Sequence, residues 1–142
     1  MTIRPAVFAD IGAIARLERS VALHPWSEGS LRDTLSLGTT RAFVDIGSSE
    51  RGYVIASVVV DEGEILTLGV DRAYRRHGIG LSLLEAVHST WRREGVIRGY
   101  LEVHHANRGA RTLYQRAGWE EVGLRAGYYG SGEDAVLMRW TP

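Results

Sequence analysis

The stretch Val70-Asp71-Arg72-Ala73-Tyr74-Arg75-Arg76-His77-Gly78-Ile79-Gly80 separates an apolar run that predicts a strand from residues at helical spacing. Glycines at such a junction let the backbone approach a ligand with its N–H groups outward. The positive end of the helix then favours an anion such as pyrophosphate, and Arg75 and Arg76 add full positive charge. The alternative is a solvated turn with a capping glycine.

Two other phosphate-binding loops do not fit this stretch. A Walker loop needs Gly-Lys-Ser/Thr, which the chain does not contain. A dinucleotide fingerprint needs a third glycine where Leu83 stands, and it begins at the strand end without an arginine-rich loop. The spacing Arg75-x-x-Gly78-x-Gly80 is therefore a different arrangement.

The segments on both sides of this loop predict alternating strands and helices. The sequence Asp61-Glu62-Gly63 between two apolar runs predicts a hairpin loop, and a loop rich in glycine and tyrosine is expected before the last strand. Helices interleaved with strands in the second half predict a mixed sheet covered on both faces, in an α/β or α+β fold. We expect strands at 2–4, 41–46, 52–60, 64–70, 99–104, 119–123 and 135–140, and helices at 10–21, 28–37, 79–94 and 108–117.

Length and composition predict a single domain over residues 1–142, because 142 residues with 44% hydrophobic content suffice for one core. Seventeen basic and seventeen acidic residues give a net charge of zero, which argues against direct nucleic-acid binding through bulk charge. The absence of cysteine excludes disulfide scaffolds, thiolate metal sites and cysteine nucleophiles. We find no targeting segment or membrane span, and we expect a cytoplasmic protein.

The loop Arg75-x-x-Gly78-x-Gly80 resembles the acyl-CoA loop of the GCN5-related N-acetyltransferases (GNAT), whose signature is Gln/Arg-x-x-Gly-x-Gly/Ala. The resemblance extends over nearly the whole chain, and it is greatest to the RimI-type branch, the ribosomal-protein N-terminal alanine acetyltransferases. Its further marks are His24-Pro25-Trp26-Ser27, Val58-Val59-Val60-Asp61-Glu62, Leu101-Glu102-Val103, Asn107, Leu113-Tyr114, Gly118-Trp119, Tyr128-Tyr129 and Glu133-Asp134-Ala135.

This resemblance implies a mostly antiparallel central sheet with a splayed strand pair that takes acetyl-CoA as cosubstrate. The strand at 65–70 would pair through its backbone with the pantetheine arm, and the loop that follows would hold the pyrophosphate. Asn107 matches a family position that contacts the cofactor. The implied cofactor-binding residues are Leu68, Gly69, Val70, Arg75, Arg76, His77, Gly78, Ile79, Gly80 and Asn107.

Two residues match the catalytic positions of the family. The resemblance implies that Glu102 is the general base, acting through a water molecule. Strand alternation places Glu102 on the opposite face from Leu101 and Val103. The alternative is a carboxylate on an exposed face. Tyr114 would protonate the departing thiolate, which is feasible for a phenol of pKa ~10 and a thiol of pKa ~8.5. The alternative for Tyr114 is an aromatic residue of the helix core.

The acceptor implied by the branch is the α-amine of a peptide or protein N-terminus, with a ribosomal protein as a candidate. An α-amine of pKa ~8 is roughly a quarter neutral near pH 7.4, against about one part in a thousand for lysine. Small-molecule amines, protein lysines and a non-catalytic acyl-CoA-binding module remain alternatives, and a monomer and a homodimer both stay open. The implied substrate-binding residues are Trp26, His104, Tyr128 and Tyr129.

Several residues depart from the pattern of the branch. Thr67 replaces the usual Asn and Gly69 the usual Ala, His104-His105-Ala106 replaces Arg-Ala-Ser, and Gly127 replaces Asn. His104 and His105 suggest a metal site, but we expect none because neighbouring strand residues point to opposite faces. His77 is expected in a solvated loop, and His88 on the exposed side of its helix.

Overall fold

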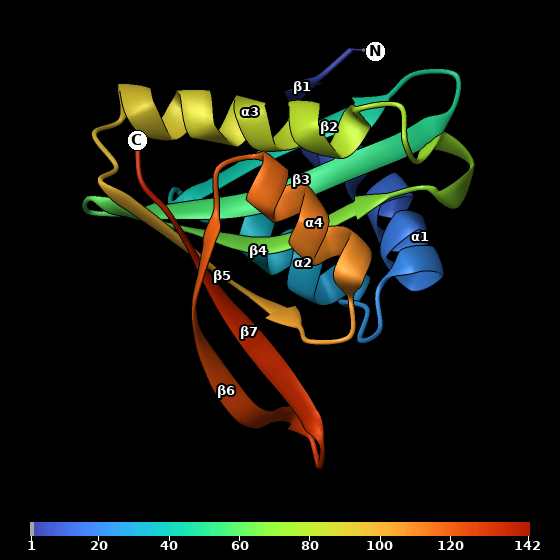
Figure 1. The fold of residues 1–142 in the computed structure, drawn as a ribbon. Coiled ribbons are helices and arrows are strands. Elements are labelled where there is room, and N and C mark those ends of the chain that lie inside the picture. The colour runs from blue at the N-terminus through green and yellow to red at the C-terminus, as the bar shows by residue number, and fades with distance from the viewer. Residues whose placement is uncertain (1) are drawn as a thin grey trace.

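The computed structural model describes residues 2–142, and it contains one seven-stranded sheet in the order β1-β2-β3-β4-β5-β7-β6 (Figure 1). Every neighbouring pair is antiparallel except β4 and β5, which are parallel. This confirms the mixed, mostly antiparallel sheet. The strands are β1 (Arg4–Pro5), β2 (Thr40–Ile46), β3 (Glu50–Val59), β4 (Glu62–Val70), β5 (Arg98–His104), β6 (Glu120–Gly130) and β7 (Glu133–Trp140).

Four helices and two short 3-10 turns connect these strands. Ser27 begins α2 as an N-cap, because its Oγ accepts a hydrogen bond from the Ser30 N–H at 3.1 Å. Gly78 begins α3 with a φ of 78°, a conformation that side chains disfavour. The elements are η1 (Phe8–Asp10), α1 (Ile11–Val21), α2 (Glu28–Leu35), η2 (Arg72–Tyr74), α3 (Ile79–Arg93) and α4 (Arg108–Arg116).

Strand alternation divides the core between the two faces of the sheet. Tyr53 and Ile55 of β3 are buried among residues of α1 and α2, whereas Val54 and Ala56 are buried among residues of α3. Gly63 and Gly99 lie under Trp91, since a Cβ at either position would stand 2.4 Å from its ring. The helices therefore cover both faces of the sheet, as predicted.

Strands β4 and β5 pair only at their beginnings and then separate. The paired residues are Glu62 with Arg98, Gly63 with Gly99 and Glu64 with Tyr100. Beyond Glu64, neither strand has the other as a partner. The fork at this point is the splayed strand pair that the resemblance implies, and Figure 1 shows β5 turning away from β4 there.

Four local predictions were wrong. The hairpin turn lies at Val60 and Asp61, because β4 begins at Glu62 and pairs with Val59. The expected glycine- and tyrosine-rich loop is part of β6, which continues to Gly130 through a register shift against β7. His88 is buried rather than exposed, since it packs between Trp119 and Trp140. Helix α2 also ends two residues earlier than expected, at Leu35.

Within residues 2–142, none of the helices combines the length and the apolar character needed to cross a membrane.

Candidate active site

A cleft of about 580 Å³ opens at the fork between β4 and β5. Glu64 and Leu66 of β4 and Glu102 of β5 face it from the side of the sheet that α1 and α2 cover. The buried neighbours Leu101 and Val103 face α3 instead, which confirms the predicted alternation. The cleft is lined by His24, Trp26, Glu64, Ile65, Leu66, Glu102, Tyr128 and Tyr129.

Glu102 is the better-enclosed of the two carboxylates in the cleft. Its Oε1 lies 3.2 Å from Arg125 Nη1, and its buried Oε2 has no hydrogen-bond partner among residues 2–142. The Glu102 carboxylate also influences Tyr128 of β6, because its proximity raises the pKa of the Tyr128 phenol. An unpaired carboxylate oxygen beside a cleft is a natural acceptor for a proton or for an N–H donor.

Glu64 is a residue of the cleft that the sequence did not reveal. Loss of solvent around it and the nearby Glu102 both raise the pKa of its carboxyl. In the sequence Glu64 is one of several acidic residues near a hairpin, and strand alternation alone does not distinguish it from the others. The only signal available was its position on the same face as Leu66, on the strand expected to bind the cofactor.

Four aromatic rings form a continuous stack beside the cleft. The ring centroids of His24 and Tyr129 are 6.2 Å apart, those of Tyr129 and His104 are 5.4 Å apart, and those of His104 and His105 are 4.7 Å apart. The stack joins the segment after α1 to the ends of β6 and β5. Tyr129 faces the cleft, whereas His104 supports it from behind and does not line the cleft.

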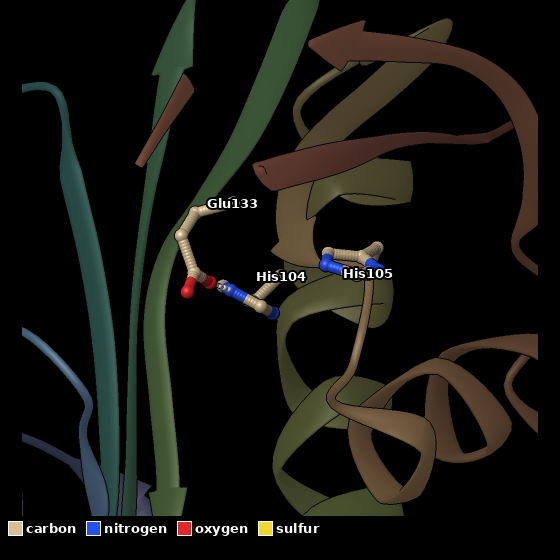
Figure 2. Close-up of side chains that lie close together, drawn as sticks. All are labelled: His104, His105 and Glu133. Atoms are coloured by element: carbon tan, nitrogen blue, oxygen red, sulfur yellow. Dashed lines mark hydrogen bonds and ion pairs between the residues drawn. The ribbon is translucent and has the colours of Figure 1, made fainter. Parts of the chain in front are cut away.

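The geometric argument against a metal at His104 and His105 was wrong. Their rings lie side by side, and with Glu133 they place possible ligand atoms within 4.8 Å of one another (Figure 2). The hydrogen bonds of His104 use both of its ring nitrogens, however. Its Nδ1 accepts from the Ala106 N–H at 3.0 Å, so its proton resides on Nε2, which donates to Glu133. In this arrangement His104 offers no free lone pair to a metal ion.

Trp26 is held in the cleft by a buried carboxylate. Glu18 of α1 is fully buried, and its Oε2 accepts a hydrogen bond from the Trp26 N–H at 2.9 Å. Its Oε1 accepts from the hydroxyls of Tyr53 and Thr67. One carboxylate thus ties the segment after α1 to both β3 and β4. The Trp26 side chain also packs against the core between α1 and α2.

The loop before α3 has the geometry of an anion site. Arg76 has a φ of 65°, which is rare for a residue other than glycine, and Gly78 follows with a φ of 78°. The first N–H groups of α3 have no partner within the helix, and they face the loop with the positive end of the helix dipole. Arg75 and His77 are exposed, as predicted for His77.

The acetyltransferase (GNAT) family model matches residues 13–119. The chain belongs to the GNAT family of acetyltransferases. Its relative in Escherichia coli K12, "[Ribosomal protein bS18]-alanine N-acetyltransferase", is 30% identical over 96% of this chain and 95% of that protein. The crystal structure of the ribosomal-protein-S18-alanine N-acetyltransferase from E. coli superposes with a TM-score of 0.90 at 29% identity, over 99% of this chain and 92% of that chain.

The fold is shared more widely within the GNAT family. Arabidopsis thaliana NAA60, crystallised in complex with acetyl-CoA, gives a TM-score of 0.88 at 22% identity, over 99% of this chain and 97% of that chain. The present chain is an acetyl-CoA-dependent N-acetyltransferase.

The residues present fit acetyl-CoA. Beyond Glu64, the edge of β4 that faces β5 has backbone groups that pair with no strand, and a pantetheine arm with amide groups can pair with them. Leu68, Gly69 and Val70 belong to this part of β4, and the loop from Arg75 to Gly80 follows after the turn η2. Gly80 itself packs against α4, since a Cβ there would stand 2.8 Å from Leu113 Cδ2.

Two further residues match functional positions of the GNAT family: Tyr114 lies within α4, and Asn107 stands at its start. Tyr114 is 7% exposed and belongs to the main core, where burial raises the pKa of its phenol. Tyr129, which lines the cleft, also raises this pKa, whereas Tyr114 itself is not among the residues that line the cleft. Asn107 caps α4, because its Oδ1 accepts from the Ala110 N–H at 3.1 Å.

Tyr53 explains two departures from the branch together. A Cβ on Gly69 would stand 2.6 Å from the Tyr53 ring, so the phenol needs glycine at this position of β4. The hydroxyl then reaches Glu18, where Thr67 also donates a hydrogen bond. Gly69 and Thr67 therefore accommodate the same buried network.

Proposed function

We propose that this GNAT enzyme acetylates the α-amine of a peptide or protein N-terminus. The observation that carries the proposal is the cleft at the β4–β5 fork. The Oε2 atom of Glu102 has no partner there, and the thioester of the cosubstrate is expected beside it. An α-amine loses its proton near neutral pH far more readily than lysine does. The E. coli relative is named for acetylating an alanine of ribosomal protein bS18, which makes a ribosomal protein a candidate acceptor.

Glu102 is the proposed general base. Its Oε2 is buried and unpaired, so it can accept a proton from the acceptor amine directly or through one water molecule. Arg125 stabilises the ionised carboxylate at Oε1, and Tyr128 closes the site on the side of β6. Loss of the proton frees the nitrogen lone pair, which the reaction requires.

Tyr114 is the proposed general acid. Bound acetyl-CoA supplies the thioester carbon that the amine attacks, so that a C–N bond forms, the C–S bond breaks, and one proton is released overall. Burial raises the pKa of Tyr114, so the phenol is fully protonated at neutral pH and can donate to the departing sulfur. Tyr114 recovers its proton from solvent or from the acetylated nitrogen.

The remaining proposed roles are binding of the cosubstrate and contact with the acceptor. The residues proposed to hold the cosubstrate are Leu68, Gly69, Val70, the loop from Arg75 to Gly80, and Asn107 through its Nδ2 group. Trp26, Tyr128 and Tyr129 are proposed to contact the acceptor, and His104 to support Tyr129 through the stack.

We infer that residues 1–142 act as one domain, since both halves of the core share one sheet. A ribosomal acceptor would place the enzyme in the cytoplasm.

The test is acetyl transfer to two peptides, followed by mass spectrometry. One peptide has a free N-terminal alanine and no lysine, and the other has a blocked N-terminus and one lysine. The enzyme contains no lysine, so lysine acetylation in the sample can come only from the second peptide. Modification of the first peptide alone supports the proposal, whereas modification of the second alone replaces it with lysine acetylation.

Tyr114→Phe tests the proposed acid. Phe fills the same buried space and removes only the hydroxyl, so the fold and acetyl-CoA binding should survive. We expect kcat to fall by about 100-fold, the usual contribution of a general acid, with an unchanged KM for acetyl-CoA. Turnover equal to the wild type would remove Tyr114 from the mechanism.

A further inference from the structure

Glu64 stands at the point where the strands β4 and β5 part. Its pairing with Tyr100 is the last contact between the two strands, and its side chain shares the face of Glu102. It is exposed to the cleft, while Ile65 next to it is buried. The carboxylate therefore reaches the cleft immediately beside the segment proposed to bind the cosubstrate.

The charges in the cleft do not balance. Glu102 is paired with Arg125, whereas no arginine or histidine among residues 2–142 lies within ion-pair distance of Glu64. The other titratable groups that line the cleft with Glu64 and Glu102 are His24 and the two tyrosines of β6, Tyr128 and Tyr129. Glu64 helps to raise the pKa of Tyr128. Arg125 neutralises Glu102 alone, so the Glu64 carboxylate leaves a negative charge available for a cation.

The acceptor arrives as a cation. An α-amine with a pKa of about 8 is mostly ammonium at pH 7, so an enzyme that binds this prevailing form must then remove its proton in the site. A carboxylate that binds an ammonium group forms charge-assisted hydrogen bonds, which are stronger than neutral ones. The proton must then pass to a second group, because a carboxylate that only binds the ammonium does not release the lone pair.

We propose that Glu64 binds the ammonium form of the acceptor amine, next to Glu102, which removes the proton. This proposal rests on the proposed function and adds a substrate-binding residue to it. The two carboxylates have separate tasks: Glu64 selects a protonated primary amine and positions it at the fork, and Glu102 accepts one proton from it. The neutral nitrogen that results faces the cosubstrate segment of β4.

The test compares Glu64→Gln with Glu62→Gln in steady-state kinetics on the alanine peptide. Glu62 lies two residues earlier on the same strand, is exposed, and does not line the cleft, so it is a matched control for loss of charge. At pH 7 we expect Glu64→Gln to raise the KM for the peptide by about tenfold or more. The KM for acetyl-CoA should stay unchanged, and Glu62→Gln should behave as the wild type.

The pH dependence separates binding of a cation from a structural effect. Above pH 9 the peptide amine is neutral, so the difference in KM between Glu64→Gln and the wild type should shrink to less than threefold. A defect of the same size at pH 7 and pH 9, or one that also appears in Glu62→Gln, overturns the proposal. If the wild type acetylates a different amine, the same comparison on that amine tests Glu64 while the α-amine assignment fails. A wild type that acetylates no amine overturns both.

Discussion

Protonation of His88 is expected to destabilise the fold in mildly acidic solution. The imidazole is 3% exposed and stacks on Trp140 with ring centroids 4.8 Å apart. Its Nε2 accepts a hydrogen bond from the Trp119 Nε1–H at 3.0 Å. Burial, with a smaller contribution from Arg92, lowers the pKa of His88 from 6.5 to about 4. A proton on Nε2 would face the Trp119 N–H, so the charged ring would also lose this bond.

The sign of the effect follows from the two pKa values. The unfolded chain binds a proton at His88 below about pH 6.5, whereas the folded chain does so only near pH 4. The stability that this group contributes is therefore fully present above pH 6.5 and is lost as the pH falls towards 4. At 1.36 kcal/mol per pKa unit the whole shift corresponds to about 3 kcal/mol, and about 2 kcal/mol of it disappears between pH 7 and pH 5.

The assay is urea unfolding at pH 7 and pH 5, followed by tryptophan fluorescence. Glutamine in His88→Gln can still accept the Trp119 hydrogen bond, but it does not titrate. His77→Gln is the matched control, because His77 is exposed in the loop before α3. The wild type and His77→Gln should each lose about 2 kcal/mol more free energy of unfolding between the two pH values than His88→Gln does. Equal losses in the wild type and His88→Gln would refute the argument.

Two further predictions concern packing around the site. Glu18→Gln removes the charge that holds Trp26, Tyr53 and Thr67, so we expect a loss of about 1–3 kcal/mol of stability and a higher KM for the peptide, with an unchanged KM for acetyl-CoA. An unaltered peptide KM would show that Glu18 has only a structural role. Gly80→Ala brings a Cβ against Leu113 on α4, which should cost about 1–3 kcal/mol in thermal or urea unfolding. Leu113→Ala in the same chain should restore part of that loss, and strictly additive effects of the two substitutions would contradict the close contact.

Local patterns were sufficient for most of the elements and for the family. Helical spacing and strand alternation predict the four helices and the burial of Leu101 and Val103, because these periods follow from backbone geometry alone. They failed for β6, where glycines and tyrosines look like a loop and pairing with β7 makes them a strand. They failed also for His88, which is polar by type but is enclosed by tryptophans that lie far from it in sequence.

The residues of the site also fall into those that the sequence predicted and those that only the structure revealed. The sequence by itself predicted the anion-binding loop from its own residues, and it predicted the base Glu102 and the acid Tyr114 through the resemblance to the GNAT family. Only the tertiary structure decided that Glu64 shares the cleft with Glu102, and that Glu18 holds Trp26. These contacts join residues that are distant in the chain, and their formation depends on where β4 and β5 part and on how α1 packs against the sheet. Short-range patterns carry no information about such long-range distances.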